Sequence, residues 1–199
     1  MQRLLNIVIF GLLILVGLTV NSANAGWLSQ SDVNLVKEGS MEMLPNVPLG
    51  KVMNIRFDHG TWDEFESDLG EKVVEFKGRV SQALHDRVVD LIVADYEVLK
   101  GFALIANTTG HISQLTKEEN DTLLAKYNGP DGTADTKRGY YLDAVRTVTS
   151  RNLFKVGTPA VIQWVVGPKG ETFQVSYVGS DAWAHIKDEG VLFDIIFGR

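Results

Sequence analysis

Cysteine is absent from this chain of 199 residues. Its absence excludes disulfide bonds, a thiolate nucleophile and metal sites with cysteine ligands. It also excludes the lipid-modified N-terminal cysteine that defines bacterial lipoproteins. The fold must therefore depend on the burial of apolar side chains, and the length is sufficient for one domain with a substantial core.

Positive charge is scarce. The chain has 19 Lys and Arg against 25 Asp and Glu, which gives a net charge of −6. Removing residues 1–25 removes one charge, that of Arg3, and brings the total to −7. Nucleic acids and anionic membranes attract clustered lysine and arginine, and no such cluster is present. We therefore predict no nucleic-acid partner and, once an export segment is removed, no membrane partner.

The usual patterns of catalytic and metal-binding residues are also missing. The four histidines stand singly, at His59, His85, His111 and His185, and none is spaced with another as metal ligands are. No Gly-X-Ser-X-Gly motif occurs, and Asp131–Asp135 lacks the closing glutamate of a calcium-binding loop. We predict no metal, no cofactor and no catalytic residue. The alternative is an exported hydrolase whose carboxylates come together only in the fold.

The first 25 residues have the order of a secretory signal peptide. Arg3 provides the positive start, Leu4–Val20 is nearly all apolar, and Ser22–Ala25 ends in small residues. We predict cleavage after Ala25, so that residues 26–199 form a single periplasmic or secreted bacterial domain. The alternative is an uncleaved membrane anchor, for which the apolar run is shorter than the ~20 residues that span a bilayer.

Two stretches predict β-hairpins. Thr61–Val80 places two strands around Asp68-Leu69-Gly70, and Ala160–Val178 places two around Gly167–Gly170. Glycine in each turn tolerates the positive φ that tight hairpins require. Alternation in the last strand assigns Phe173, Val175 and Tyr177 to one buried face. We expect a mainly antiparallel sheet of about four strands.

Helical periodicity predicts the rest of the fold. A capping box, Thr116 to Glu119, marks the start of one helix, and residues 79–152 read as a helical insertion between the sheet halves. The fold class is α+β. The expected helices are Gly26–Glu38 (or an extended arm), Pro48–Phe57 ended by His59-Gly60, Val80–Lys100 (with a continued strand as the alternative), Lys117–Tyr127, a short Ala134–Asn152 and Asp188–Gly198. Asn107–Gly110 is expected to be a loop.

Three tryptophans are the candidate binding residues. Trp62, Trp164 and Trp183 are most simply core or sheet-face residues, because tryptophan is large and mostly apolar. The functional alternative is an exposed patch that binds a protein, a small ligand or a glycan.

Several short motifs resemble a group of uncharacterised exported bacterial proteins. They include Val36-Lys37-X-Gly39, Trp62-X-X-Phe65, Val73-Val74-X-Phe76-X-Gly78 and Gln163-Trp164, and the likeness covers residues 36–78 and 153–197. The plan is similar to the β-lactamase inhibitor proteins and to the small outer-membrane assembly lipoprotein, which are binding modules. The resemblance implies a non-catalytic protein-binding or envelope-assembly module.

Overall fold

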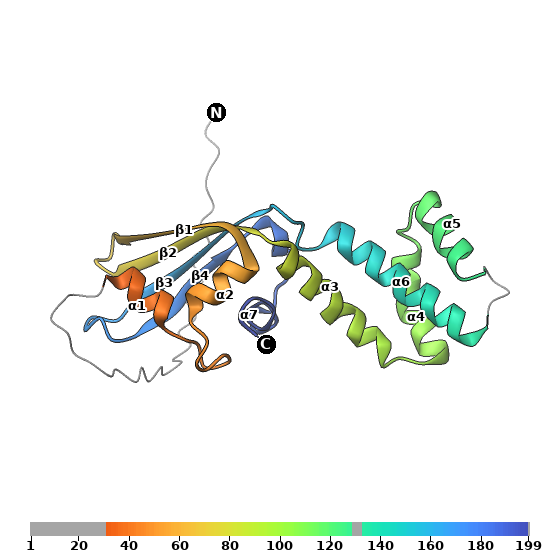
Figure 1. The fold of residues 1–199 in the computed structure, drawn as a ribbon, viewed down its shortest axis with the longest axis horizontal. Coiled ribbons are helices and arrows are strands. Elements are labelled where there is room, and N and C mark those ends of the chain that lie inside the picture. The colour runs from red at the N-terminus through yellow and green to blue at the C-terminus, as the bar shows by residue number, and fades with distance from the viewer. Residues whose placement is uncertain (1–30, 129–132, 199) are drawn as a thin grey trace, which may run out of the picture.

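A computed structural model describes residues 31–128 and 133–198 of the chain. The predicted signal peptide and its cleavage site lie outside these ranges. The described residues form an α+β fold with two parts, which Figure 1 shows side by side. We call the sheet with its covering helices the body and the helices of residues 82–152 the arm. No helix in the described ranges combines the length and apolar character of a membrane span.

The body is built on one antiparallel sheet with the strand order β1-β2-β3-β4. Its strands are β1 (Phe57–Glu66), β2 (Lys72–Val80), β3 (Pro159–Val166) and β4 (Phe173–Gly179). Both predicted hairpins are therefore confirmed, and β2 pairs with β3 to join them. In the first turn Gly70 has a φ of 77° and donates its N–H to the carbonyl of Ser67 at 2.8 Å.

Short helices cover one face of this sheet. They are α1 (Asp32–Glu38), capped by Ser31, α2 (Leu49–Arg56), the 3-10 turn η2 (Asp181–Trp183) and α7 (Glu189–Phe197). Side chains from these helices and from the covered face of the sheet form the main hydrophobic core. The predicted C-terminal helix is confirmed to within a residue at each end.

The end of α2 differs from the prediction. The helix stops at Arg56, Pro48 precedes its first turn, and Phe57 already belongs to β1. His59, with a φ of 55°, lies in a bulge of β1 between Asp58 and Thr61. Gly60 is needed there because a Cβ at this position would come within 2.6 Å of the Phe76 ring. His59-Gly60 thus shapes a strand that packs on Phe76 rather than ending a helix.

The arm contains α3 (Gln82–Glu97), α4 (Gly101–Ile112), α5 (Lys117–Lys126) and α6 (Ala134–Asn152). The capping box of α5 and the bounds of α6 are as predicted, although α6 is a long helix of 19 residues. The expected loop Asn107–Gly110 is wrong, because these residues continue α4. Thr108 is fully buried and donates its hydroxyl to the Leu104 carbonyl at 2.9 Å, so its side chain is satisfied within the helix.

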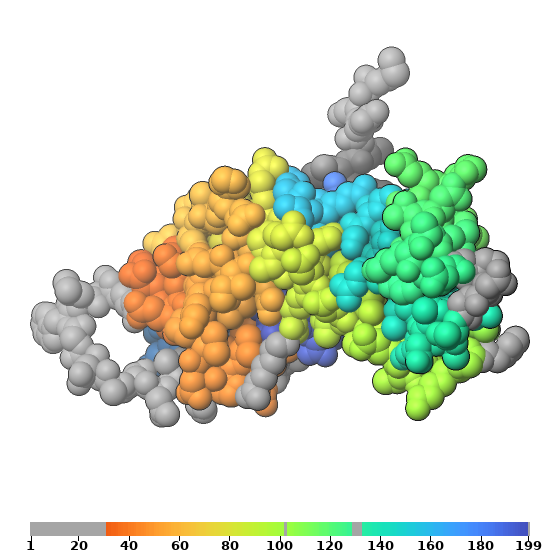
Figure 2. Space-filling view, turned by 45° about the vertical axis from the view of Figure 1, so that its right-hand side comes forward, coloured from red at the N-terminus to blue at the C-terminus, as the bar shows by residue number. Residues whose placement is uncertain are grey.

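The arm projects from the body and remains joined to it through α3. The first turns of α3 bury Leu84 and Val88 in the body core. Later turns bury Val89 and Val93 against Val145 of α6 in a second, smaller core. Figure 2 shows the green residues of α4 and α5 at one end of the molecule, with α3 between them and the body. One continuous helix therefore contributes to both cores.

Tyr177 does not lie on the buried face that strand alternation predicts. It pairs with Gln163, whereas Val175 pairs with Trp164, so Ser176 is an extra residue in β4. The bulge turns Tyr177 to the opposite face, where 52% of the residue is exposed. Phe173 and Val175 keep the predicted orientation.

Ser81 is the joint between body and arm, and its hydroxyl has two partners. It accepts the Leu84 N–H as the N-cap of α3 and donates to the Ile55 carbonyl at 2.8 Å, in a site with 5% exposure. We predict that Ser81→Ala lowers the free energy of unfolding by about 1–2 kcal/mol, since it removes the N-cap of α3 and the hydroxyl donor to the part-buried Ile55 carbonyl. Chemical denaturation followed by circular dichroism measures this.

The matched control is Ser113→Ala. That hydroxyl is exposed and bonds only to a carbonyl of its own helix, at Gly110. Its loss should change the free energy of unfolding by less than about 0.5 kcal/mol. Equal effects of the two substitutions would contradict the role given to Ser81.

Candidate functional site

Two of the three candidate tryptophans lie inside the body core. Trp164 is 0% exposed and Trp183 is 3% exposed, while Trp62 is half-buried. Their indole N–H groups at Trp164 and Trp183 have no hydrogen-bond partner among the described residues. These two rings therefore act through apolar burial and present no surface to a ligand.

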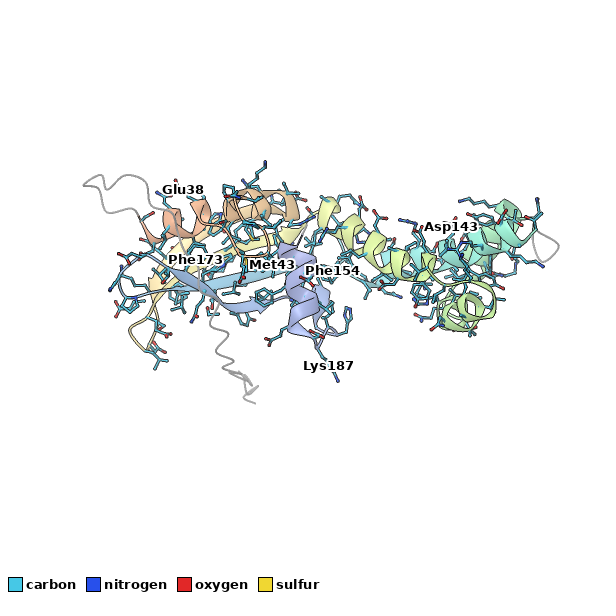
Figure 3. The ribbon with its side chains drawn as sticks, turned by 90° about the horizontal axis from the view of Figure 1, so that it is seen from below. Glu38, Met43, Asp143, Phe154, Phe173 and Lys187 are labelled. Atoms are coloured by element: carbon cyan, nitrogen blue, oxygen red, sulfur yellow. The ribbon has the colours of Figure 1, made fainter. Side chains whose placement is uncertain are left out.

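The tryptophans belong to a continuous row of aromatic rings. Trp62 stacks on Trp164 with centroids 5.4 Å apart and meets the edge of Phe76 at 5.0 Å. The row continues to the base of the arm through Phe57, Trp183 and Phe154, with centroid separations of 5.5, 6.4 and 5.4 Å. Figure 3 labels Phe154 where the arm meets the body. The binding surface predicted from the tryptophans is thus mostly a structural row, with only Trp62 partly accessible.

The histidines are dispersed in the fold as they are in the sequence. His85 holds the joint of the arm, with its Nδ1 3.0 Å from the Phe154 carbonyl oxygen. His111 packs edge-on against Tyr96, and burial lowers the pKa of its imidazole. Within the described ranges, no three His, Asp or Glu side chains lie close enough together to hold a metal ion.

Two carboxylates hold α1 on the sheet. Glu64 of β1 accepts the N–H of Val33 at 3.2 Å, and Asp32 of α1 pairs with Lys72 of β2 at 3.0 Å. A shallow concavity on the arm has two carboxylates, but all of its lining comes from one exposed face of α5: Lys117, Glu118, Asp121, Thr122 and Ala125. Lys117 pairs with Asp121 along the helix, as surface residues four apart commonly do.

Polar contacts hold the arm helices on α6. Asp143 of α6 accepts from Lys126 and from the Tyr127 hydroxyl, both at 2.6 Å. Burial alone would raise the pKa of Asp143, but these hydrogen bonds and the neighbouring positive charges hold it below its ordinary value. Arg138, also on α6, donates to the Leu99 carbonyl at 2.6 Å beyond the end of α3.

A second clamp fixes the start of α5. Arg151 donates to both carboxylate oxygens of Glu119, at 2.7 and 2.8 Å, and to the Gln114 carbonyl at 2.6 Å. The backbone N–H of Thr116 lowers the pKa of Glu119 most, and Arg151 lowers it further. Leu123 is the buried residue of α5, and these polar contacts hold the two ends of the helix on α6.

One exposed surface, on α4, was not predicted from the sequence. We define it as the exposed residues Ala103, Ile105, Ala106, Asn107, Thr109 and Gly110. No Asp, Glu, Lys or Arg occurs from residue 101 to residue 115, a signal that was visible in the sequence. The neighbouring α5, in contrast, is charged along most of its length.

The polar side chains of the α4 surface are turned back onto their own helix. The Asn107 amide donates to the Ala103 carbonyl at 2.8 Å, and the Thr109 hydroxyl donates to the Ile105 carbonyl at 2.9 Å. One N–H of the Asn107 amide and the Thr109 hydroxyl proton are therefore engaged within the helix. Ile105 itself is 42% exposed. The α4 surface is suited to contact with another apolar surface.

No protein-family model, curated protein or solved structure matches this chain. The resemblance to exported bacterial binding modules therefore stays a prediction.

Trp164→Ala tests the structural role of the aromatic row. The substitution removes a fully buried ring, and we expect the free energy of unfolding to fall by about 3–5 kcal/mol. Leu69→Ala is the control, because Leu69 is 86% exposed in a hairpin turn and its loss should cost less than about 0.5 kcal/mol. Chemical denaturation measures both. A change below ~1 kcal/mol for Trp164→Ala would show that the ring is not a core element.

Acid should loosen α5 before the body. The pKa values of Asp143 and Glu119 are lower in the folded state, so their stabilising contribution is present above the ordinary carboxyl range and is lost as the pH falls below about 4. We predict faster hydrogen exchange of the α5 amides at low pH, after correction for intrinsic rates, while the β2 and β3 amides stay protected.

Asp143→Asn should speed the exchange of the α5 amides already at neutral pH and remove the part of the acid dependence that comes from Asp143, while the part that comes from Glu119 remains. Asp121→Asn is the control, since Asp121 is exposed and pairs only along its own helix. Uniform acid loosening of arm and body in the unaltered protein would count against separate attachment of α5.

Proposed function

We propose that this chain is a non-catalytic, exported protein-binding module, and that the α4 surface on its arm contacts a protein of the bacterial envelope. The observation that carries this proposal is an exposed helix face without charge, at a position that projects from the body. Surfaces of soluble proteins normally carry interspersed charges, and an uncharged face with engaged polar groups is typical of contact surfaces.

The construction of the arm supports this role. Because α3 is buried in the body core at one end and packs on α6 at the other, the arm is held in a defined direction. The contacts of Arg138 and Arg151 fix the ends of α3 and α5 relative to α6. A preorganised surface loses little conformational entropy on binding, which favours affinity.

The described residues do not supply the side-chain arrangements that the two alternative functions require. The hydrolase alternative required inward-facing carboxylates, and the carboxylates on α5 line an open surface of one helix. The glycan or small-ligand alternative required exposed tryptophans, and two of the three are buried. Export to the periplasm remains part of the proposal and rests on residues 1–25 of the sequence.

Crosslinking in envelope extract tests the proposal with a matched pair of variants. Ala106 on α4 and Ala125 on α5 are both exposed helical alanines. We expect the unaltered protein and Ala125→Glu to recover the same envelope protein. Ala106→Glu should recover at least about tenfold less, because it places an unpaired charge in an apolar contact.

Two results would oppose this expectation in different ways. If crosslinking recovers no partner with the unaltered protein, the binding function itself is contradicted. If the two variants recover a partner equally well, the binding function stands and the α4 surface is the wrong contact.

A further inference from the structure

The two outer strands of the sheet differ in charge. Both outer strands have a bulge, but only β1 has exposed carboxylates, those of Asp58, Asp63, Glu64 and Glu66. Natural sheets use charged side chains to prevent other strands from pairing with an outer edge. The β1 edge is protected in this way.

The β4 edge has no charge. Phe173–Gly179 contains neither a charged residue nor proline, and the neighbouring β3 is also uncharged. Among residues 31–128 and 133–198, no backbone hydrogen bond joins the outer side of β4 to another segment. An uncharged edge with unpaired backbone groups is a template for strand addition.

The side chains of β4 are also compatible with a neutral partner. Gln174 and Tyr177 are exposed on the open face of the sheet, and Val175 and Val178 are half-buried on the covered face. A strand added at this edge would meet uncharged neighbours on both faces. The polar pair on the open face, Glu75 with Lys77, lies two strands away on β2.

We propose that β4 pairs antiparallel with β4 of a second copy, about a two-fold axis at Tyr177, so that two sheets become one sheet of eight strands. Closed two-fold pairing is the commonest symmetry of homo-oligomers, and it uses the same surface on both copies. This inference is independent of the partner proposed for the arm.

Charge favours this edge over any other for self-association. Two copies of this acidic chain repel each other, and pairing through β1 would bring their carboxylates together. Pairing through β4 places the two β1 strands at opposite ends of the sheet, about 34 Å apart at strand spacings of ~4.8 Å. That distance is several times the screening length of about 8 Å in physiological salt.

The bulge determines where a two-fold axis can lie. Residues directly opposite each other in an antiparallel pair point to the same face of the sheet. The extra residue at Ser176 puts Val175 and Tyr177 on opposite faces, so an axis at Ser176 would set covered-face residues against open-face residues. An axis at Tyr177 sets Val178 opposite Val175 on the covered face and places the two Tyr177 side chains directly opposite each other on the open face.

Sedimentation equilibrium of the purified, exported protein over a concentration range up to about 1 mM tests the proposal. Seven-residue strands give a small interface, so we expect a reversible dimer with a dissociation constant on the order of 100 μM. Tyr177→Lys and Tyr177→Glu should each raise this constant roughly tenfold or more, because each places like charges across the axis. Gln174→Lys is a second variant with the same expected direction.

A charge-swap experiment separates pairing at β4 from any other contact. An equal mixture of Tyr177→Lys and Tyr177→Glu should recover the association that each variant has lost. Phe65→Lys is the matched control, since Phe65 is 43% exposed on the same face of the sheet at the β1 edge, and it should leave the dissociation constant unchanged. Circular dichroism verifies that the variants are folded.

The proposal is overturned if the unaltered protein is monomeric throughout this range. It is also overturned if a dimer forms that Tyr177→Lys and Gln174→Lys do not weaken, or that the charge-swapped mixture does not restore.

Discussion

Burial of the first turns of α3 in the body core is the contact on which the shape of the molecule depends. Leu84 and Val88 pack there with the covered face of the sheet, and each such side chain contributes about 1.5–3 kcal/mol when fully buried. The same helix then carries the small core formed with α6. Because one rigid element belongs to both cores, the direction of the arm follows from the packing of the body.

The aromatic row belongs to the same body core as Leu84 and Val88. It runs from Trp164 in the centre of the sheet to Phe154 at the base of the arm. Phe154 adopts a φ of 45°, a conformation that a bulky residue reaches only when its surroundings hold it. The ring of Trp183 and the bond between His85 and the Phe154 carbonyl supply that support. The aromatic rings around Phe154 thus help to determine how the arm is presented.

Local signals made most of the fold predictable from the sequence. The hairpins follow from alternation and turn glycines, and α5 follows from a capping box that the structure contains in full. The loop expected at Asn107–Gly110 was wrong because asparagine, threonine and glycine favour turns in isolation, whereas here burial of Leu104 and Thr108 continues the helix. Tyr177 was misplaced because a single bulged residue at Ser176 inverts the alternation. The candidate surface on α4 depends on which helix faces remain uncovered, which no local pattern specifies.

The strands that flank the arm meet directly at its base. Val80 exchanges backbone hydrogen bonds with Thr158 and Gly157, at 2.9 and 2.8 Å, so the chain leaves the sheet and returns to the same point. The arm thus occupies the place of a tight turn. Closing a loop of this length in place of a short turn costs about 2–3 kcal/mol of chain entropy, at ~0.6 kcal/mol for each doubling. The pairing of β2 with β3 therefore joins residues far apart in the sequence, and contacts of this kind slow the folding of a domain.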